Sequence, residues 1–426
     1  MKKIIYLFAF AALFAACEKE EMSTPPLSVE DPLAEVIRIA QEGAAMLDDA
    51  QTRSDIARRI DRSSISCKIN PATRAGEADD TLYYVVNYAD NAGFAIVSAD
   101  DNASDGARLI AVTESGSYTA GEKTENEGFN MYVDMLSFGP PTTDSLITEN
   151  PGRFPGDILD SIVTLTDWVQ VQPMVSVTWN QGYPYNQFCP MQKEDTTQLS
   201  VVGCAPVAVA QIFSAYGIPE TFNCSFDDNV SNNYSSCALN WTGINSTNWR
   251  YTSQNNYTEQ VAMLLREVGH RCSAIYDQET TAYLTDIIHT IPTFGYKIPV
   301  STTYNYLTIV EELINARAVL MGGHRIKENN QVSGHAWVVD GYKSRDRDVA
   351  YYTYLDDGSY VLWETKHEDF DYLHINWGYS GQDNGYFKAG VFDLSQGYEY
   401  DYATISHIQR AYTFNFELIT HISPNL

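Results

Sequence analysis

Apolar residues recur at helical spacing in four segments of the chain, and each segment predicts a helix. The first begins after Asp31 and Pro32, which suit a helix cap and a first turn. Its apolar face comprises Leu33, Val36, Ile37, Ala40, Ala44 and Leu47. The other three predicted helices cover residues 203–216, 257–270 and 307–317.

Strand-like runs lie in two other parts of the chain. The runs "TLYYVVNY" (81–88) and "GFAIVSAD" (93–100) are joined by a short turn and predict a hairpin. From about residue 318 onward successive apolar and aromatic runs predict strands, with Asp357-Gly358 as a hairpin turn. Helices followed by antiparallel strands indicate the α+β class.

Changes in composition divide the chain, which at 426 residues is too long for one ordinary core. A polar, proline-containing stretch over 18–32 predicts a tether. Residues 33–170 then predict a small α+β domain without an obvious catalytic constellation. Residues 171–426, where aromatic, glycine and turn residues become dense, predict a second domain.

Composition excludes one class of partner. The hydrophobic share of 44% and the aromatic share of 12% favour well-packed globular domains over disorder. With 27 basic against 55 acidic residues, the formal charge is −28. Because such a surface repels phosphates, we expect no nucleic acid partner.

The first 17 residues predict export. Lys2 and Lys3 precede an uncharged apolar run (4–16) that is too short to span a bilayer and is typical of a signal peptide. The run ends in "FAAC", which resembles a bacterial lipobox, although Phe14 stands where Leu is more usual. This resemblance implies cleavage before Cys17, lipidation of its thiol and a membrane anchor. A plain secretory signal cut nearby is the alternative; with the anchor, we expect a cell-envelope protein at the outer membrane or surface.

Six cysteines remain after Cys17, and no two of them form a CxxC pair, which argues against a structural zinc site. Export permits disulfides, and Cys224 with Cys237 is the closest pair, but spacing does not establish a bridge. We therefore leave open the pairing of Cys67, Cys189, Cys224, Cys237 and Cys272. We expect neither a metal nor a cofactor.

Cys204 heads the apolar run "CAPVAVAQI". A thiol at a helix N-terminus lies at the positive end of the helix dipole, which stabilises the thiolate. Pro206 is tolerated in a first helical turn. Taken alone, the pattern is more often that of a buried structural cysteine.

A nucleophilic cysteine needs a base, and "SGHAWVVDGY" offers His335 at the start of a strand-like run. A lone histidine in such a place is more often a hydrogen-bonded core residue. His324 is the rival, but it lies in a charged, turn-like stretch. Further along, "HINWGY" offers Asn376 to accept the imidazole N–H and Trp377 to shield that bond from water.

Gln181, in "WNQGYPYN" before Cys204, completes the set. Its side-chain amide, with the backbone N–H of Cys204, would form an oxyanion hole. Each of these residues is ordinary when taken singly. Their joint order, Gln, Cys, His and Asn-Trp, matches that of papain-like proteases.

Four segments, "WNQGYPYN", "GCAPVAVAQI", "GHAWVVDGY" and "HINWGYSGQDNGYF", together resemble the streptopain family of secreted bacterial cysteine proteases. The resemblance implies a papain-like fold for 171–426, with a central nucleophile helix and an antiparallel sheet. It implies Cys204 as nucleophile, His335 as general base and Gln181 as oxyanion donor, with Asn376 and Trp377 as the orienting and shielding pair.

The same resemblance extends to substrate contacts and to the first domain. "LNWTGI" resembles a segment that places a tryptophan near the cleft, so Trp241 is a candidate substrate-binding residue, as is Gly334 beside the predicted base. The hairpin over 83–101 resembles the family's inhibitory propeptide, which implies an inhibitory prodomain over 33–170. Pro206 and Val207 depart from the family's nucleophile helix.

These observations predict a surface-anchored cysteine endopeptidase made as a zymogen, which acts through a Cys204–His335 thiolate–imidazolium pair and an acyl-enzyme. Its partners would be protein or peptide substrates, its own prodomain as intramolecular inhibitor, and the membrane through a lipid on Cys17. One alternative is a Cys/His amidase acting on cell-wall peptides. Another is a catalytically idle lipoprotein that binds a partner at the cell surface.

Overall fold

The computed structural model describes residues 33–48, 58–70, 81–100, 108–137, 158–226, 235–250, 252–326, 332–354, 359–394 and 413–425. The predicted signal peptide, Cys17, the tether and the Asp357-Gly358 turn lie outside these ranges. Within them, no helix combines the length and apolar character needed to cross a membrane.

The N-terminal region is a small sheet covered by one helix on each face. The predicted first helix is confirmed as α1 (Ala34–Leu47), and the predicted hairpin as antiparallel β2 and β3. The sequence analysis did not predict helix α3. The elements are α1, η1 (Arg62–Ser64), β1 (Ser66–Ile69), β2 (Thr81–Asn87), η2 (Ala89–Asn91), β3 (Phe94–Ser98), β4 (Leu109–Thr113) and α3 (Glu127–Leu136).

Alternation along β3 explains why both faces of this small sheet are covered. Successive side chains of a strand point to opposite faces. Ala95 and Val97 pack in the same core as α1, whereas Phe94 and Ile96 pack in the core that contains Phe129 of α3. All five residues of β3 are therefore buried.

The C-terminal region joins a group of helices to an antiparallel sheet, which confirms the expected α+β class. The predicted helices are confirmed as α4, α6 and α8. The elements are α4 (Cys204–Tyr216), β7 (Thr221–Phe222), β8 (Cys237–Ala238), α5 (Trp241–Ser246), α6 (Thr258–Arg271), α7 (Leu284–Thr290), η3 (Ile291–Phe294), β9 (Val300–Thr303), α8 (Tyr306–Ile314), β10 (Val319–Ile326), β11 (Val332–Tyr354), β12 (Tyr360–Asn376), β13 (Gly385–Lys388), η4 (Ala389–Phe392) and β14 (Phe414–Thr420).

One sheet runs through both regions. Its strand order is β1-β2-β3-β4-β13-β12-β11-β10-β14-β9, so β4 of the N-terminal region pairs directly with β13. Helix α4 packs on β10 and β11, where Val207 and Val209 share a core with Leu320 and Val338. The first residue of α4 is thus held against the sheet.

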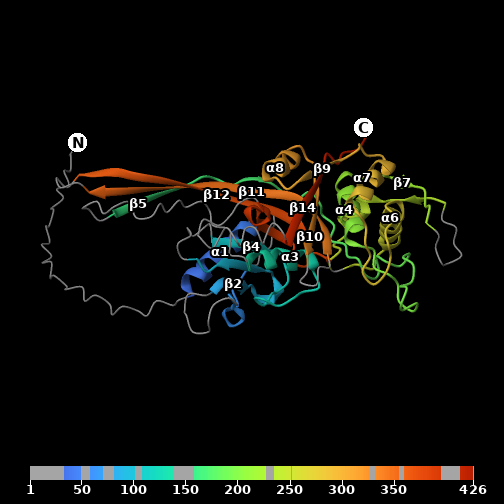
Figure 1. The fold of residues 1–426 in the computed structure, drawn as a ribbon, viewed down its shortest axis with the longest axis horizontal. Helices are drawn as coiled ribbons and strands as arrows, with labels where there is room; N and C mark the ends of the chain where they lie inside the picture. The colour runs from blue at the N-terminus through green and yellow to red at the C-terminus, as the bar shows by residue number, and fades with distance from the viewer. Residues whose placement is uncertain are drawn as a thin grey trace, which may run out of the picture.

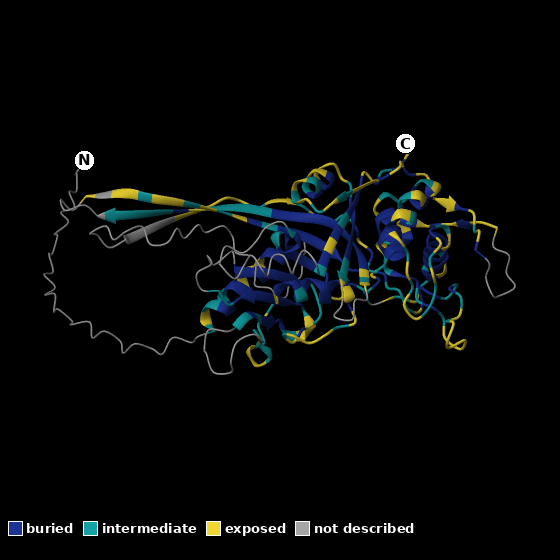
Figure 2. Cartoon of the chain, in the orientation of Figure 1, coloured by how far each residue is buried: buried dark blue, intermediate teal, exposed yellow. Residues whose placement is uncertain are grey.

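The long strands β11 and β12 form a hairpin that extends far beyond the rest of the molecule, whereas α4, α6 and α7 gather at the other end (Figure 1). The base of the hairpin is buried, and its outer part consists mainly of intermediate and exposed residues (Figure 2). Two strands that precede the helices, β5 (Ile158–Leu165) and β6 (Val169–Val171), pair with β11. The boundary predicted at residues 170 and 171 falls within β6 and stays a prediction.

Candidate active site

Cys204 is the first residue of α4. The preceding Gly203 has φ 97°, a left-handed conformation that favours glycine, and a Cβ at this position would lie 3.0 Å from the Thr280 side chain. No side chain caps the helix. The Cys204 thiol therefore lies at the positive end of the helix, beside the backbone N–H of Ala205.

His335, on β11, lies against this thiol. Burial raises the pKa of Cys204, but the charge of His335 and its hydrogen bond, with the backbone N–H groups of Ala336 and Ala205, lower it overall. Burial lowers the pKa of His335, but the charge and hydrogen bond of Cys204, the Trp377 carbonyl and Glu127 raise it overall. The two shifts favour one charge state, a thiolate beside an imidazolium.

The other imidazole nitrogen contacts a backbone oxygen. His335 Nε2 lies 3.1 Å from the carbonyl oxygen of Trp377, which can accept its N–H. The ring also stacks on Trp337 at 6.1 Å and lies 5.4 Å from the ring of Tyr379. The contact of Nε2 with the Trp377 carbonyl fixes which nitrogen of the ring is directed toward Cys204.

The hydrogen bond that we expected from the imidazole N–H of His335 to the side-chain carbonyl of Asn376 is not formed. Asn376 Nδ2 donates to Val177 O at 2.9 Å, and its Oδ1 accepts from Gln211 Nε2 at 3.3 Å and from Gly378 N at 3.2 Å. The reason is strand alternation, since the Asn376 side chain points toward α4 and the carbonyl of the next residue contacts the imidazole. Asn376 thus anchors the turn that carries Trp377.

The sequence analysis missed Gln211. Besides its contact with Asn376, its Oε1 accepts a hydrogen bond from Trp179 N at 3.0 Å. This fully buried amide therefore connects α4, β12 and the segment before Gln181. An amide within the apolar stretch "VAVAQIF" was the available signal, because a buried polar side chain requires partners.

The indole of Trp377 is buried beside the base. Its Nε1 donates to Asp383 O at 3.0 Å, and its ring packs at 5.1 Å from Trp337 and 5.2 Å from Phe387. Trp377 N donates to Asn384 Oδ1 at 3.0 Å. The bond between Asn376 and His335 that Trp377 was expected to shield is not formed, and a shielding role for the indole beside His335 stays a prediction.

Gln181 is placed next to the head of α4 by its backbone, because its carbonyl accepts a hydrogen bond from Val202 N at 2.9 Å. Its side chain hydrogen-bonds to the hydroxyl of Tyr379. Burial, then the charge of Cys204, raises the pKa of Tyr379, while hydrogen bonds from the backbone N–H of Glu127 and from Gln181 oppose this shift. Tyr379, which the sequence analysis did not single out, therefore lies between the predicted oxyanion donor and the thiol.

The first turn of α3 lies directly over the base. A Cβ at Gly128 would be 2.6 Å from His335 Cδ2 and 2.6 Å from Trp377 Cε3. Asn126, which caps α3, also donates from Nδ2 to Asp383 Oδ2 at 3.2 Å. The N-terminal region thus contacts the proposed catalytic residues through a helix start without a side chain.

A buried charge cluster joins the same two regions. His374 Nδ1 lies 2.6 Å from Asp340 Oδ1, and its Nε2 lies 3.3 Å from Glu114 Oε1, just beyond β4. Burial lowers the pKa of His374, but the carboxylates of Asp340 and Glu114 raise it to about 10. Arg250 lies 3.9 Å from the other oxygen of Glu114. Glu114 therefore bridges the two regions through cationic partners.

The two candidate substrate-binding residues differ in position. Gly334 lines a cavity of about 520 Å³ that also has Cys204 and His335 in its walls. Trp241 does not line this cavity; it is buried in the core around α4, and its Nε1 donates to Pro219 O at 2.7 Å. The indole nitrogen of Trp241 thus has its hydrogen-bond partner in the core, and a substrate contact by Trp241 stays a prediction.

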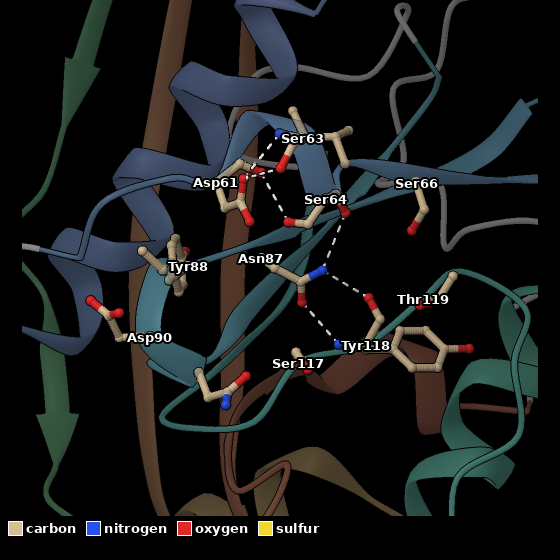
Figure 3. Close-up of a pocket in the computed structure, with 13 residues that line it drawn as sticks. Asp61, Ser63, Ser64, Ser66, Asn87, Tyr88, Asp90, Ser117, Tyr118 and Thr119 are labelled. Atoms are coloured by element: carbon tan, nitrogen blue, oxygen red, sulfur yellow. Dashed lines mark hydrogen bonds between the residues drawn. The ribbon is translucent and has the colours of Figure 1, made fainter.

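A second hollow, of about 470 Å³, lies in the N-terminal region (Figure 3). Asn87 lies at its centre, where Nδ2 donates to Ser64 O and Tyr118 O, and Oδ1 accepts from Tyr118 N (Figure 3). Its lining includes several serines but neither a cysteine nor a histidine. These hydrogen bonds connect neighbouring loops, and they do not indicate catalytic chemistry.

One cluster in the described part of the chain has the donor types of a metal site. Asp346, His367 and Asp369 lie together on the β11–β12 hairpin, two of them exposed. The imidazole already contacts carboxylates through both nitrogens, at 2.6 Å from Asp348 and 3.0 Å from Asp369. This arrangement suits a protonated histidine between acids, and we assign it no ligand.

Two protein families match separate parts of the chain. Residues 179–387 match the Peptidase C10 family, and residues 47–137 match the Spi protease inhibitor family. The first match contains Gln181, Cys204, His335, Asn376 and Trp377. The second contains α3, whose first turn covers His335.

Two curated relatives are similar to this chain at low identity. The thiol protease/hemagglutinin PrtT of Porphyromonas gingivalis is 22% identical over 359 residues, which cover 78% of this chain and 37% of that relative. Streptopain of Streptococcus pyogenes is 22% identical over 369 residues, which cover 78% of this chain and 80% of streptopain. The chain thus spans little more than a third of PrtT and most of streptopain.

Among solved structures, a prointerpain A fragment of Prevotella intermedia is similar with a TM-score of 0.49 and 20% identity, covering 85% of this chain and 100% of the fragment. Active interpain A of the same organism is similar with a TM-score of 0.38 and 22% identity, covering 59% of this chain and 94% of that one.

Proposed function

We propose that this chain is a zymogen whose N-terminal inhibitor domain blocks an endopeptidase, and that the endopeptidase acts through Cys204 and His335. The proposal starts from the fact that the chain belongs to the Peptidase C10 family of cysteine-type peptidases. Family membership confirms the papain-like fold and the enzyme class expected from the sequence motifs. The observation that carries the proposal is the coupled pair itself. The pKa of Cys204 is lowered and that of His335 is raised, each through the other.

The first half of the proposed reaction forms an acyl-enzyme. The Cys204 thiolate attacks a peptide carbonyl, and the S–C bond forms as the carbonyl oxygen becomes an oxyanion. The backbone N–H of Cys204 and the side-chain amide of Gln181 donate hydrogen bonds to that oxygen. His335 then gives its proton to the leaving amine as the C–N bond breaks.

Water completes the reaction. The now neutral His335 accepts a proton from water, whose oxygen attacks the acyl carbon. The S–C bond breaks, the carboxylic acid leaves, and the proton on His335 restores the thiolate–imidazolium pair. The Trp377 carbonyl, 3.1 Å from His335 Nε2, supports the imidazolium in both halves and keeps the ring oriented.

Inhibition is proposed to act through α3. Its first turn contacts His335 and Trp377 so closely that only glycine fits at position 128. A substrate chain that needs to reach this side of His335 would have to displace the helix. Removal of the inhibitor domain would therefore open the site without rebuilding it.

Anchoring is a separate part of the proposal. The apolar segment that ends just before Cys17 supports export and lipidation. A Cys17→Ser protein should move from the membrane fraction to the soluble fraction of a lipidating host. Unchanged membrane association would argue for a plain secretory signal or another anchor.

The peptidase activity is tested with matured protein and casein. Wild-type protein should cleave casein, whereas Cys204→Ala and His335→Ala should not. His270→Ala, an exposed histidine at the end of α6, is the matched control and should keep full activity. Release of peptides from peptidoglycan with casein left intact would favour the cell-wall amidase. Full biological activity of Cys204→Ala would favour an idle binding protein.

A further inference from the structure

The cavity beside Cys204 has an acidic wall. The cavity of about 520 Å³ is bordered by the segment 280–285, by the head of α4 and by strands β10, β11 and β14. Glu417 on β14 is the one carboxylate among the described residues that line it. A cavity of this size accepts one or more side chains of a bound peptide.

The sheet register places Glu417 of β14 level with the part of β11 that carries His335, with β10 between the two strands. Gly322 of β10 pairs with Ala336 of β11 on one side and with Glu417 of β14 on the other. Residues directly opposite one another in a sheet share a face. Glu417 therefore lies on the same face as Ala336, the neighbour of His335, with only a glycine between them.

The surface between these positions is apolar. Leu284 packs onto Gly322 so closely that a Cβ at position 322 would lie 2.4 Å from Leu284 Cδ1. Ala282 belongs to the same wall. An extended aliphatic stem can therefore lie on this surface while its end reaches Glu417.

The charge of Glu417 has no cationic partner in the described part of the chain. Its Oε1 accepts a hydrogen bond from the Ser301 hydroxyl of β9, which orients the carboxylate. No ion pair involves Glu417 among the described residues. His324, which also lines the cavity, lies on β10, where its backbone is opposite Gly334 of β11 and Asn415 of β14. The half-buried carboxylate is therefore available to a cation from outside.

We infer that Glu417 makes the cleft selective for peptides with an arginine or lysine side chain close to the scissile bond. The aliphatic stem of that side chain lies over Leu284 and Ala282, and its cationic end forms a charge-assisted hydrogen bond with Glu417. This inference rests on the proposed peptidase function, because it uses the same cleft. It adds the class of substrate, which neither the family match nor the catalytic residues specify.

The test uses matured protein and a positional-scanning library of fluorogenic peptides. Wild-type protein should prefer Arg or Lys over Leu at one position near the cleaved bond. Glu417→Gln should lower kcat/KM for the basic substrate about tenfold, the effect of one lost charge-assisted hydrogen bond, and leave the Leu substrate within about twofold. Glu311→Gln, an exposed residue of α8, is the matched control and should change neither value.

The second variant reverses the charge at position 417. Glu417→Lys should shift the preference at that position toward Asp or Glu, a gain that a folding defect cannot produce. Equal basic preference in wild-type and Glu417→Gln protein, or no basic preference in an active wild-type enzyme, would overturn the inference and leave the peptidase intact. Absence of cleavage of every peptide by wild-type protein would instead overturn the proposed function.

Discussion

A thiol becomes a nucleophile only where its surroundings favour the anion, and Cys204 differs in this respect from the other cysteines of the peptidase region. Burial raises the pKa of Cys189, Cys237 and Cys272 to about 12 and that of Cys224 to about 11. Cys204 is the one described cysteine whose pKa is lowered, because it has an imidazole and two backbone N–H groups as partners. Its reactivity therefore follows from contacts, since burial alone would make it inert.

Gln181 supports a prediction at this scale. Gln181→Ala should lower kcat about 10²- to 10³-fold, because the developing oxyanion loses one donor. The rate at which iodoacetamide alkylates Cys204 in the matured enzyme should stay within about twofold, since alkylation forms no oxyanion. The rate of peptide hydrolysis and the rate of Cys204 alkylation are each measured in samples quenched at timed intervals. An equal loss of both rates would show that Gln181 supports the fold of the site.

Individual residues were predictable from the sequence where they belong to a motif. Cys204, His335 and Gln181 stand in recognisable segments, and the structure brings all three together. The orienting atom was not predictable, because a backbone carbonyl of Trp377 replaces the expected side chain of Asn376, and carbonyl direction depends on strand alternation and register. The surroundings of Trp241, which lies in the core around α4, were not predictable because a motif position does not reveal whether an indole faces the cleft or the core.

At the scale of elements, helix α3 connects inhibition to the site. Eight of its ten residues are buried, since it packs between the small sheet and the residues around Trp377. Its starting residues approach His335 only because Gly128 has no side chain. The contact is therefore sensitive to a single methyl group.

Gly128→Ala should loosen the inhibitor domain. Alanine improves helix propensity by about 1 kcal/mol, so the helix itself is not weakened. A Cβ 2.6 Å from two side chains must push the helix away, and an overpacking cost of about 1.4 kcal/mol corresponds to about a tenfold change. In full-length zymogen, alkylation of Cys204 should accelerate about tenfold.

The control for this variant is Glu125→Ala, which changes an exposed side chain just before the helix cap. It should leave the alkylation rate of the zymogen unchanged. If Gly128→Ala zymogen remained folded and labelled at the wild-type rate, α3 would not control access to Cys204.

Elements with a strong hydrophobic pattern were predictable, and elements defined by their neighbours were not. The apolar face of α1 and the apolar, β-branched and aromatic runs of β2 and β3 are visible in the sequence. Helix α3 has an apolar face as marked as that of α1, but it is short and contains glycine in its first turn, both of which weaken the helical signal. The strands of the β11–β12 hairpin were expected, but its projection from the body, where β5 pairs with the outer part of β11, has no signal in the hydrophobic pattern.

At the scale of the whole molecule, the two regions are joined by a continuous sheet and by a charge cluster. Strand β4 pairs with β13, and Glu114 beside it contacts His374. Burial raises the pKa of Glu114, but the hydrogen bond and charge of His374, with the charges of Arg250 and Arg58, lower it overall. The contact between the regions therefore depends on two ionised partners.

The sign of each shift gives a pH dependence. A carboxyl with a depressed pKa stabilises the folded contact above its ordinary 4.5 and loses this contribution as the pH falls through its lower folded value. His374 has a raised pKa, so its contribution is full below its ordinary 6.5 and is lost as the pH rises toward about 10. The contact should be strongest between 4.5 and 6.5.

Zymogen conversion should therefore accelerate as the pH falls below 4.5. Glu114→Gln should convert at pH 6 as fast as the wild type does in acid, because its side chain cannot be ionised.

The assay uses both proteins with the additional substitution Cys204→Ala, and a trace of mature enzyme digests them. The ratio of their two digestion rates at each pH removes the pH dependence of the protease itself. Glu122→Gln, an exposed residue, is the control; a ratio independent of pH would exclude Glu114 as the acid-sensitive contact.

The central claim, that the molecule carries one activated thiol paired with His335, is tested most directly by labelling the matured enzyme with limiting iodoacetamide at pH 6 and locating the label by mass spectrometry. The account predicts label on Cys204 alone, loss of peptide hydrolysis in proportion to labelling, and little label in His335→Ala. Inactivation that accompanies label on another cysteine, or peptide hydrolysis retained by Cys204→Ala, would contradict it.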